Sequence, residues 1–460
     1  MSSHFDAIVI GTGQGGAPLA AKLGQSGRKT AVIERHLFGG TCVNVGCTPT
    51  KTYVASARAA HVARHAASLG VVIEGTISVD LAKVKARKDE VIESSRNGVE
   101  KWLRDTPNIT VFEGHGRFTG PHSVRVEGSD GKTHELSADA IYINTGTRAI
   151  VPDLEGIDQI NWHTNSTILE LTELPEHLVI IGGSYIALEF AQMIRRFGSR
   201  VTVLVRGERV LAREDKDVAL QIQSVLAREG VKFMFSTQAS RVEPDGQGVR
   251  IHAGDKTIDA SHLLFATGRV PNTDDLGLEH AGIVPNRHGM IETDNQLRTN
   301  VPGIWALGDV KGAPAFTHIS YNDFQIVYGN LVEGKDLSTD HRLVPYCVFT
   351  DPQLGGVGIT EKKAREKGYK LKIGKYPMTS VSRAIERDET AGLMKLVIDA
   401  ANDMILGASI LACEGGELVQ VLHTLMLAKQ PYTLLKGAIY IHPTLVEGFF
   451  GLMASVKPAD

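Results

Sequence analysis

The chain contains 460 residues, too many for a single hydrophobic core, and this length predicts about two to four domains. Hydrophobic residues make up 42% and charged residues 22%, as in ordinary soluble globular proteins, and a net charge of −3 argues against binding to nucleic acid or an anionic membrane. No apolar run approaches the roughly 20 residues of a membrane span. The polar start, Met1 to Asp6, leads straight into a predicted strand, so we expect no secretory signal. Four cysteines are too few for a disulfide scaffold and fit the reducing cytoplasm.

A dinucleotide-binding fingerprint follows the strand predicted over residues 5–10. Glycine occupies its first, third and sixth positions, which are Gly11, Gly13 and Gly16. A helix and a second strand follow, and that strand ends in Glu34. The glycines permit a tight turn and close approach to a pyrophosphate, and the acid can bind a ribose 2′-hydroxyl.

A second nucleotide-binding unit repeats this pattern further along the chain. Gly182 aligns with Gly11, after a strand predicted over residues 178–181 and before a helix that ends near residue 197. Ser184 replaces the middle glycine and weakens the match. The repeat of the whole unit indicates two nucleotide sites.

The acid is missing from the second copy. Val205 takes its place and is followed by Arg206, with Arg209 and Arg213 nearby. Without the acid a 2′-phosphate is not repelled, and arginine can bind it with two hydrogen bonds. The sequence therefore predicts NADPH rather than NADH, with an ordinary basic surface loop as the alternative.

Two of the four cysteines, Cys42 and Cys47, lie close together before an Ala-rich stretch that predicts a helix from Tyr53 to Ala67. The positive end of a helix dipole lowers a thiol pKa, and a short Cys-x4-Cys loop can form an easily reduced disulfide. Two unrelated buried cysteines are the alternative. No zinc or other metal site is predicted, because Cys347 and Cys413 are isolated.

The rest of the chain adds a long helix and a separate C-terminal domain. Periodic apolar residues predict an amphipathic helix over residues 80–105, inserted with the preceding helix into the first nucleotide fold. From about residue 341, strands and helices alternate without a phosphate-binding loop, which predicts an α+β domain. In this domain His442 precedes Glu447 by five residues. The two side chains are either a catalytic base with its orienting carboxylate or a structural pair.

Six motifs, in order along nearly the whole chain, resemble those of the FAD-dependent pyridine nucleotide–disulfide oxidoreductases. That family includes dihydrolipoamide dehydrogenase, glutathione reductase and mercuric reductase. The motifs are the first fingerprint with Glu34, GGTCVNVGC with Lys51, the second fingerprint with Tyr185 and Glu189, ATGR at 266–269, GD at 308–309 and HPTLVE at 442–447.

The resemblance implies an α/β fold with two Rossmann-like domains, for FAD and NADPH, and a C-terminal α+β dimerisation domain. The FAD-binding domain would comprise residues 1–149 and 272–340, the NAD(P)-binding domain 150–271, and the interface domain 341–460. The implied FAD ligands are Gly11, Gly13, Gly16, Glu34, Thr41, Lys51, Gly116, Thr145, Gly146, Asp309 and Thr317. The implied nicotinamide ligands are Gly182, Tyr185, Ile186, Glu189, Arg206, Arg213, Gly268 and Arg269.

The same resemblance implies a catalytic path. NADPH would reduce FAD, and the flavin would reduce a Cys42–Cys47 disulfide, with Cys47 as the thiol nearer the flavin and Cys42 as the thiol that attacks substrate. Lys51 would pair with Glu189 beside the flavin, and Tyr185 would move aside for the nicotinamide. His442, oriented by Glu447, would act as acid and base from the other subunit of a homodimer.

The electron acceptor is the open part of the prediction. A small-molecule disulfide is the first choice, and Hg(II) or Cu(II) reduced by the same thiols is the second. GGTCVNVGC and the arginines after Val205 resemble mercuric reductase, but the chain ends without its vicinal cysteine pair and has His442, which that enzyme tends to lack. Two further functions stay open, namely a subunit of a larger complex, as for dihydrolipoamide dehydrogenase, and a flavin reductase with inert cysteines.

Overall fold

The structure is a computed structural model that describes residues 3–459. Met1, Ser2 and Asp460 lie outside the described residues, so the polar N-terminal start is covered only from Ser3. The chain divides into two compact units that each combine several segments. Unit 1 comprises the chain up to Thr52 with Lys85–Ile150 and Gly268–Arg342, and unit 2 comprises Tyr53–Val84, Val151–Thr267 and the chain from Leu343 onward.

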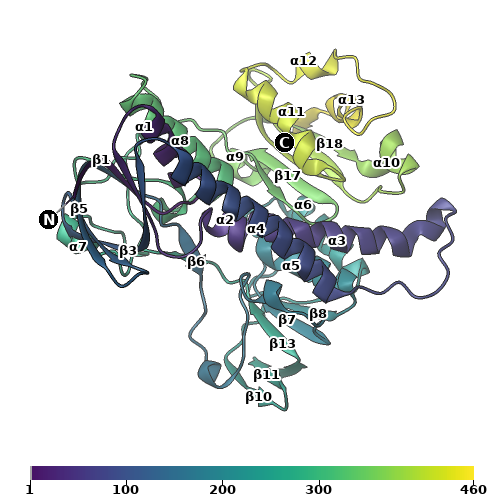
Figure 1. The fold of residues 1–460 in the computed structure, drawn as a ribbon. Helices are drawn as coiled ribbons and strands as arrows, with labels where there is room; N and C mark the ends of the chain where they lie inside the picture. Colours follow the sequence, from purple (N-terminus) through teal and green to yellow (C-terminus); the bar gives the residue numbers. More distant parts are fainter. Residues whose placement is uncertain (1–2, 460) are drawn as a thin grey trace. The chain divides into compact units, whose positions relative to one another are not determined.

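Unit 1 is built on a six-stranded mixed sheet (Figure 1). The first strand of the chain, β1, pairs in parallel with β2 and with β5, as expected for a dinucleotide fold. Strands β3, β4 and β5 follow one another as an antiparallel meander. The strands are β1 (Ser3–Ile10), β2 (Thr30–Glu34), β3 (Ile109–Gly120), β4 (Ser123–Gly128), β5 (Thr133–Ile143) and β15 (Ile304–Ala306).

Two helices, α1 (Gly16–Gln25) and α8 (Thr317–Leu331), pack on each other and cover one face of this sheet. Ala20 and Leu23 of α1 meet Val9 and Val32 in that core. These buried residues recur at the helical period along α1, which is why this segment forms a helix that packs on the strands.

The connection from β2 to β3 carries the inserted helices (Figure 1). They are α2 (Gly40–Asn44), α3 (Cys47–His65) and α4 (Leu81–Asp105), and the helix predicted over residues 80–105 is confirmed. The helix predicted from Tyr53 begins earlier, at Cys47, so Cys47 is its first residue. Cys42 lies instead in the separate short helix α2, because Val45 leaves helical geometry with φ −143°.

Unit 2 contains the second nucleotide fold and the C-terminal sheet. The four-stranded parallel sheet has the order β13-β7-β8-β9, and its strands are β7 (His177–Ile181), β8 (Arg200–Leu204), β9 (Val231–Met234) and β13 (His262–Phe265). Helices α5 (Tyr185–Phe197) and α6 (Lys216–Arg228) pack on one face, and β10 (Arg241–Asp245), β11 (Gly248–Ala253) and β12 (Lys256–Ala260) form an antiparallel sheet whose residues join the core of the other face.

The C-terminal part forms a six-stranded antiparallel sheet with several helices. Its strands are β16 (Tyr346–Val348), β17 (Gln353–Gly358), β18 (Leu371–Pro377), β19 (Leu393–Asp399), β20 (Ile405–Ala412) and β21 (Lys457–Ala459). Its helices are α9 (Glu361–Glu366), α10 (Ser382–Glu386), α11 (Gly415–Leu427), α12 (Thr433–Lys436) and α13 (Gly448–Ala454). The predicted fold class, two Rossmann-like folds and an α+β domain, is therefore confirmed. Within residues 3–459, no helix is both long and apolar enough to cross a membrane.

A buried lysine anchors β19 in unit 2. The side chain of Lys395 is 2% exposed, and its ammonium lies 2.9 Å from carboxylate oxygens of Asp215 and of Glu361 and 3.1 Å from Asp217. Asp215 also accepts the backbone N–H groups of Glu361 and Lys362 at the start of α9. The cluster thus joins α6, α9 and β19 through charges removed from water.

Replacing Lys395 with Met should strongly destabilise the protein, because it leaves buried carboxylates without their cation. Breaking a buried ion pair from one side typically costs about 3–5 kcal/mol. We expect a clear fall in the thermal unfolding midpoint of the purified protein. Lys372→Met, which removes a more exposed ion pair between β18 and Asp403 in the turn after β19, should change the midpoint little. Equal falls in both variants would contradict the argument from burial.

Candidate functional site

The first glycine turn in unit 1 cannot accommodate side chains. Gly11 has φ +97°, and a Cβ there would lie 2.5 Å from the carbonyl oxygen of Asn144. A Cβ on Gly16 would lie 2.1 Å from the carbonyl oxygen of Gly11, and one on Gly13 would lie 2.9 Å from Asn144 Oδ1. The turn therefore brings bare backbone to the N-terminus of α1, where N–H groups can receive a phosphate.

Asn144, at the end of β5, holds this turn in place. Its Oδ1 accepts the N–H of Gly16 at 2.9 Å, and its Nδ2 donates to the carbonyl of Leu307 at 2.8 Å. Glu34 accepts both the N–H and the hydroxyl of Thr12, at 3.0 and 2.6 Å, which fixes its carboxylate beside the turn. The role of Asn144 was missed from the sequence, because an asparagine after a strand ordinarily signals only a turn.

The Gly308–Asp309 turn is held by a buried carboxylate on α8. Asp323 is fully buried and accepts the N–H of Gly308 at 2.8 Å. Lys311 and Arg342 lie 3.3 and 2.9 Å from the oxygens of Asp323 and balance its charge. None of these three supporting residues was singled out from the sequence, since their partners come from distant segments.

Asp309 itself is shielded from water, and burial raises its carboxyl pKa above the ordinary value. Its Oδ2 accepts a 3.3 Å hydrogen bond from the hydroxyl of Thr147. Arg269 donates to that hydroxyl at 2.7 Å and to the Thr147 carbonyl at 2.6 Å. A buried acid with a neighbouring donor network suits a cofactor hydroxyl.

Gly268 and Arg269 lie in unit 1, and their predicted role as nicotinamide ligands stays a prediction. Strand pairing places them in this unit. Strand β14 (Arg269–Pro271) is antiparallel to β6 (Thr147–Ala149), and this ribbon returns the chain to unit 1.

These residues of unit 1 fit a dinucleotide cofactor. The three glycines form a backbone cradle, and Gly146, with φ +66°, faces open space. The hydroxyl of Thr145 is buried and, among the described residues, has no hydrogen-bond partner. Buried polar groups are rarely left unpaired, so this hydroxyl favours a ligand at the turn. Gly116 lies inside the sheet beside Ile33 and Val124, and its contact with FAD stays a prediction.

The cysteine pair belongs to the same unit as this cradle. Both cysteines are unbridged, and their thiols are joined by a hydrogen bond. The Cys47 sulfur also lies 3.1 Å from the hydroxyl of Thr317, the first residue of α8. The hydrogen bond to Cys47, burial and the electrostatic effect of Cys47 together raise the pKa of Cys42. Cys47 is the first residue of α3, a position where the helix dipole favours a thiolate.

The second glycine turn, in unit 2, repeats the geometry of the first. Gly182 has φ +146°, and a Cβ there would lie 2.3 Å from the carbonyl oxygen of Ala266. Gly183 lies against Val205, and a Cβ on it would be 2.8 Å from that side chain. Val205 is buried where the first copy carries Glu34, so this position supplies no carboxylate to the turn.

The arginines after this turn have different tasks. Arg209 folds back and donates to the carbonyls of Leu211 and Ala212, both at 3.0 Å, which closes the loop. Arg206 and Arg213 are exposed. Arg206 directly follows Val205 and is therefore the better placed of the two to meet a phosphate at the edge of the turn.

Helix α5 starts at Tyr185 and carries Ile186 and Glu189 in its first turns. Glu189 is only 3% exposed, and its Oε1 accepts the N–H of Phe349 at 2.9 Å. Lys51, in contrast, belongs to unit 1, so its pairing with Glu189 stays a prediction.

His442 and Glu447 are brought together in unit 2 as the sequence suggested. Nδ1 of His442 lies 2.9 and 3.0 Å from the two carboxylate oxygens of Glu447. This hydrogen bond and the charge of Glu447 raise the pKa of His442. The imidazole is 67% exposed and lies in a segment with the exposed side chains of Ile439 and Ile441. These exposed apolar side chains lie in the part of the chain that carries the exposed His442.

Comparison with known proteins decides the family. The sequence matches the family described as pyridine nucleotide-disulphide oxidoreductase over residues 5–323, and the dimerisation domain of that family over residues 344–451. The chain belongs to this family. It is thus a flavoprotein disulfide oxidoreductase that uses a flavin and a nicotinamide cofactor, and its dimerisation domain supports a homodimer.

Several relatives of the oxidoreductase are similar over nearly their whole length. The pyridine nucleotide-disulfide oxidoreductase RclA of Escherichia coli (strain K12) is 37% identical over 99% of this chain and 100% of its own. A mercuric reductase of Streptomyces lividans is 34% identical, covering 90% of this chain and 88% of its own, and a dihydrolipoyl dehydrogenase of Chlamydia muridarum is 32% identical, covering 97% and 96%.

Solved structures of RclA show the same fold as this oxidoreductase. The structure described as HOCl-induced flavoprotein disulfide reductase RclA from E. coli superposes with a TM-score of 0.90 at 37% identity, covering 98% of this chain and 100% of that one. Its Cu(II) complex superposes with a TM-score of 0.91 at 36% identity, covering 99% of each chain.

The Glu447 carboxylate should set the pH dependence of this oxidoreductase if His442 acts as a base. Glu447→Gln removes the charge that raises the His442 pKa, which should fall toward the ordinary value of about 6.5. The neutral imidazole then persists to lower pH, so the acid limb of the kcat/KM profile should move to lower pH. The maximum should also drop, because the ring loses its orientation.

Glu386→Gln is the matched control, since Glu386 raises the His442 pKa by charge alone and more weakly. It should shift the limb less. An unchanged acid limb in Glu447→Gln would exclude His442 as the titrating base.

Proposed function

We propose that this enzyme transfers electrons from NADPH, through FAD bound in unit 1, to the Cys42–Cys47 pair and then to a disulfide acceptor. The observation that carries the proposal is the cysteine pair itself. Cys47 begins α3, shares a hydrogen bond with Cys42, and contacts Thr317 in the unit that also holds the glycine cradle. We further propose that the protein acts in the cytoplasm, where thiols are kept reduced and a disulfide is usually transient and catalytic.

The chemistry requires two half-reactions. FAD, held in unit 1, would supply the two-electron link between NADPH and the disulfide of Cys42 and Cys47. The Cys42 thiolate then attacks an acceptor disulfide RSSR and expels one RS⁻, and Cys47 attacks the mixed disulfide and expels the second. The balance is NADPH + H⁺ + RSSR → NADP⁺ + 2 RSH.

The proposed division of roles follows the residues of each unit. In unit 1, Gly11, Gly13 and Gly16 would receive the FAD pyrophosphate, Glu34 a ribose hydroxyl, and Asp309 a hydroxyl of the flavin side chain. The remaining proposed FAD ligands are Thr41, Lys51, Gly116, Thr145, Gly146 and Thr317. Gly268 and Arg269 of the same unit are proposed as ligands of the nicotinamide nucleotide. In unit 2, Gly182, Tyr185, Ile186, Glu189, Arg206 and Arg213 would serve the nicotinamide nucleotide.

His442 is proposed as the proton acceptor that keeps Cys42 reactive. The raised pKa of Cys42 means that this thiol needs a base before it can attack. Hydrogen bonding of Nδ1 to Glu447 leaves Nε2 as the nitrogen that can take that proton. The exposure of His442 in one chain, with Ile439 and Ile441 nearby, supports its action on the cysteine pair of a second subunit.

A metal ion is the second candidate acceptor, because RclA has been solved as a Cu(II) complex and mercuric reductases are close relatives. Thiolates bind and reduce soft ions, with the balance NADPH + 2 Cu²⁺ → NADP⁺ + H⁺ + 2 Cu⁺. The only other cysteines, Cys347 and Cys413, are isolated in the sequence, so this chain has no vicinal pair to deliver Hg(II).

Arg206→Ala should separate the two nicotinamide nucleotides. If Arg206 meets the 2′-phosphate, KM for NADPH should rise about tenfold, as expected for one charge-assisted contact, while KM for NADH changes less than about twofold. Steady-state rates with each nucleotide measure this. Arg228→Ala, an arginine at the far end of α6, is the control and should alter neither KM. Equal effects on both nucleotides would exclude a 2′-phosphate contact.

An acceptor panel distinguishes the candidate reactions. NADPH oxidation by the FAD-loaded homodimer should be fast with at least one small disulfide, and Cys42→Ser should abolish that turnover while NADPH still reduces the flavin. Turnover with Cu(II) or Hg(II) alone, lost in the same variant, would instead favour metal reduction. Turnover that survives in Cys42→Ser would indicate a flavin reductase with inert cysteines.

A further inference from the structure

Two helices of this enzyme carry functional and supporting side chains at the same spacing. In α3, Arg58 follows Lys51 by seven residues, and in α5, Arg196 follows Glu189 by seven residues. Seven residues make nearly two helical turns, so each arginine lies on the same face as the functional side chain that precedes it.

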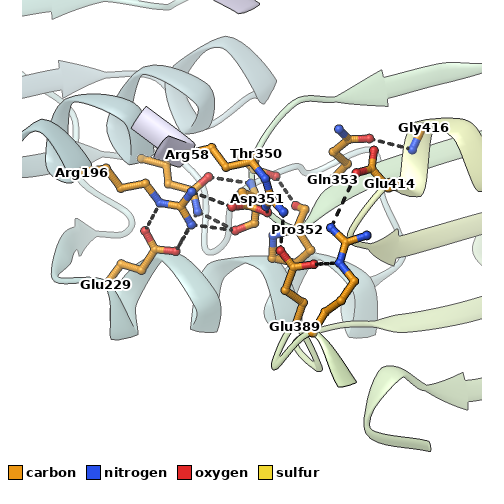
Figure 2. A network of polar contacts seen from close by, with 12 residues as sticks. Arg58, Arg196, Glu229, Thr350, Asp351, Pro352, Gln353, Glu389, Glu414 and Gly416 are labelled. Carbon is orange, nitrogen blue, oxygen red and sulfur yellow. Dashed lines mark hydrogen bonds and ion pairs between the residues drawn. The ribbon is translucent and has the colours of Figure 1, made fainter. Parts of the chain in front are cut away.

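A single carboxylate joins the two arginines. Asp351 Oδ1 lies 2.7 Å from a guanidinium nitrogen of Arg58, and Oδ2 lies 2.7 Å from a guanidinium nitrogen of Arg196 (Figure 2). Burial would raise the pKa of Asp351, but the charges of Arg196 and Arg58 outweigh it and hold the pKa below its ordinary value. Asp351 is therefore an anion that contacts α3 and α5 at the same time.

The backbone around Asp351 also binds α5 directly. The N–H of Phe349 donates to Glu189 Oε1 at 2.9 Å, and the N–H of Asp351 donates to Gln192 Oε1 at 2.7 Å. Gln192 Nε2 returns a hydrogen bond to the Asp351 carbonyl at 2.7 Å. The segment from Phe349 to Asp351 thus binds the buried polar stripe of α5 over two turns.

Further acids fix the outer ends of both arginines. Glu229 holds Arg196 through two hydrogen bonds of 2.8 Å, and Glu389 is hydrogen-bonded to Arg58 (Figure 2). The Arg196 side chain is only 6% exposed. A planar guanidinium group that is hydrogen-bonded on two sides cannot shift easily, because its N–H groups point in fixed directions.

We propose that Asp351 is a positioning residue that sets the register of α3 against α5 and so determines where Glu189 presents its carboxylate. This inference rests on the proposed function, in which Lys51 and Glu189 act together at the flavin. A slip of one helical turn is about 5.4 Å, which would separate such a pair. Val54 and Ala57 of α3 line one small pocket with Glu189 and Gln192, so the two helices face each other in this part of unit 2.

The test is Asp351→Asn in the FAD-loaded homodimer. Asparagine keeps the size and the backbone hydrogen bonds but removes both ion pairs. We expect reduction of the flavin by NADPH, followed by stopped-flow absorbance, to slow about tenfold or more, since small displacements of a reacting group have large effects on rate. The long-wavelength thiolate-to-flavin absorbance should weaken, and KM for NADPH should change less than about twofold.

A second pair of variants keeps the inference testable if Asp351→Asn does not fold. Arg58→Met removes only the contact from α3 and should slow flavin reduction in the same way, whereas Arg58→Lys should restore most of the rate. Glu361→Gln is the control, because it removes one carboxylate from the buried Lys395 cluster in the same unit without touching α3 or α5. It should lower the thermal midpoint but leave the rate and the absorbance unchanged.

Glu189→Gln separates failure of the inference from failure of the proposed function. If Glu189→Gln leaves flavin reduction unchanged, the proposed role of Glu189 is wrong, and so is the positioning role of Asp351 that depends on it. If Glu189→Gln slows reduction but Asp351→Asn and Arg58→Met match the Glu361→Gln control, Asp351 is merely structural and only the inference is overturned.

Discussion

The carboxylate of Asp323 is fully buried and that of Asp351 is 17% exposed, and each lies between two cationic side chains. Asp323 contacts Lys311 and Arg342 and receives the N–H of Gly308, while Asp351 contacts two arginines of unit 2. Because little water reaches these carboxylates, each depends on its cationic partners for stabilisation. The segments that carry those cations are therefore held next to the carboxylate. Functional turns and helices of both units depend on this constraint.

The two nucleotide folds show how one backbone device serves two ligands. Gly11 and Gly182 both lie so close to a neighbouring carbonyl that a side chain is excluded, and the bare turn leads into the N-terminus of a helix. The difference lies at the end of the next strand, where Glu34 caps the first turn and Val205 packs on the second. The two turns therefore share their backbone geometry and differ in the side chain at the end of the next strand.

The redox centre combines local and distant control of charge. Cys47 stands at the start of α3, where the helix dipole favours a thiolate, while its hydrogen bond to Cys42 is the largest cause that raises the pKa of Cys42. Cys42 therefore needs a base to become a nucleophile, which gives the exposed His442–Glu447 pair its proposed task.

The sequence by itself determined the fold class, the glycine turns and the position of the reactive cysteines. These features depend on local spacing, such as glycines at fixed offsets after an apolar strand, or two cysteines five positions apart before a helix. Even there, the start of α3 was placed six residues late, at Tyr53 rather than Cys47, because the Thr-Pro-Thr stretch has weak helix propensity.

Only the tertiary structure decided which side chains hold the functional groups in place. Asn144 reaches the N–H of Gly16, Asp323 reaches Gly308, and Asp351 joins Arg58 to Arg196, yet each pair or triad is assembled from segments with no shared local pattern. The assignment of Arg269 to unit 1 likewise came from the pairing of β14 with β6. A buried polar side chain is chosen to satisfy a partner that the fold brings to it, so its role is defined only once the chain has folded.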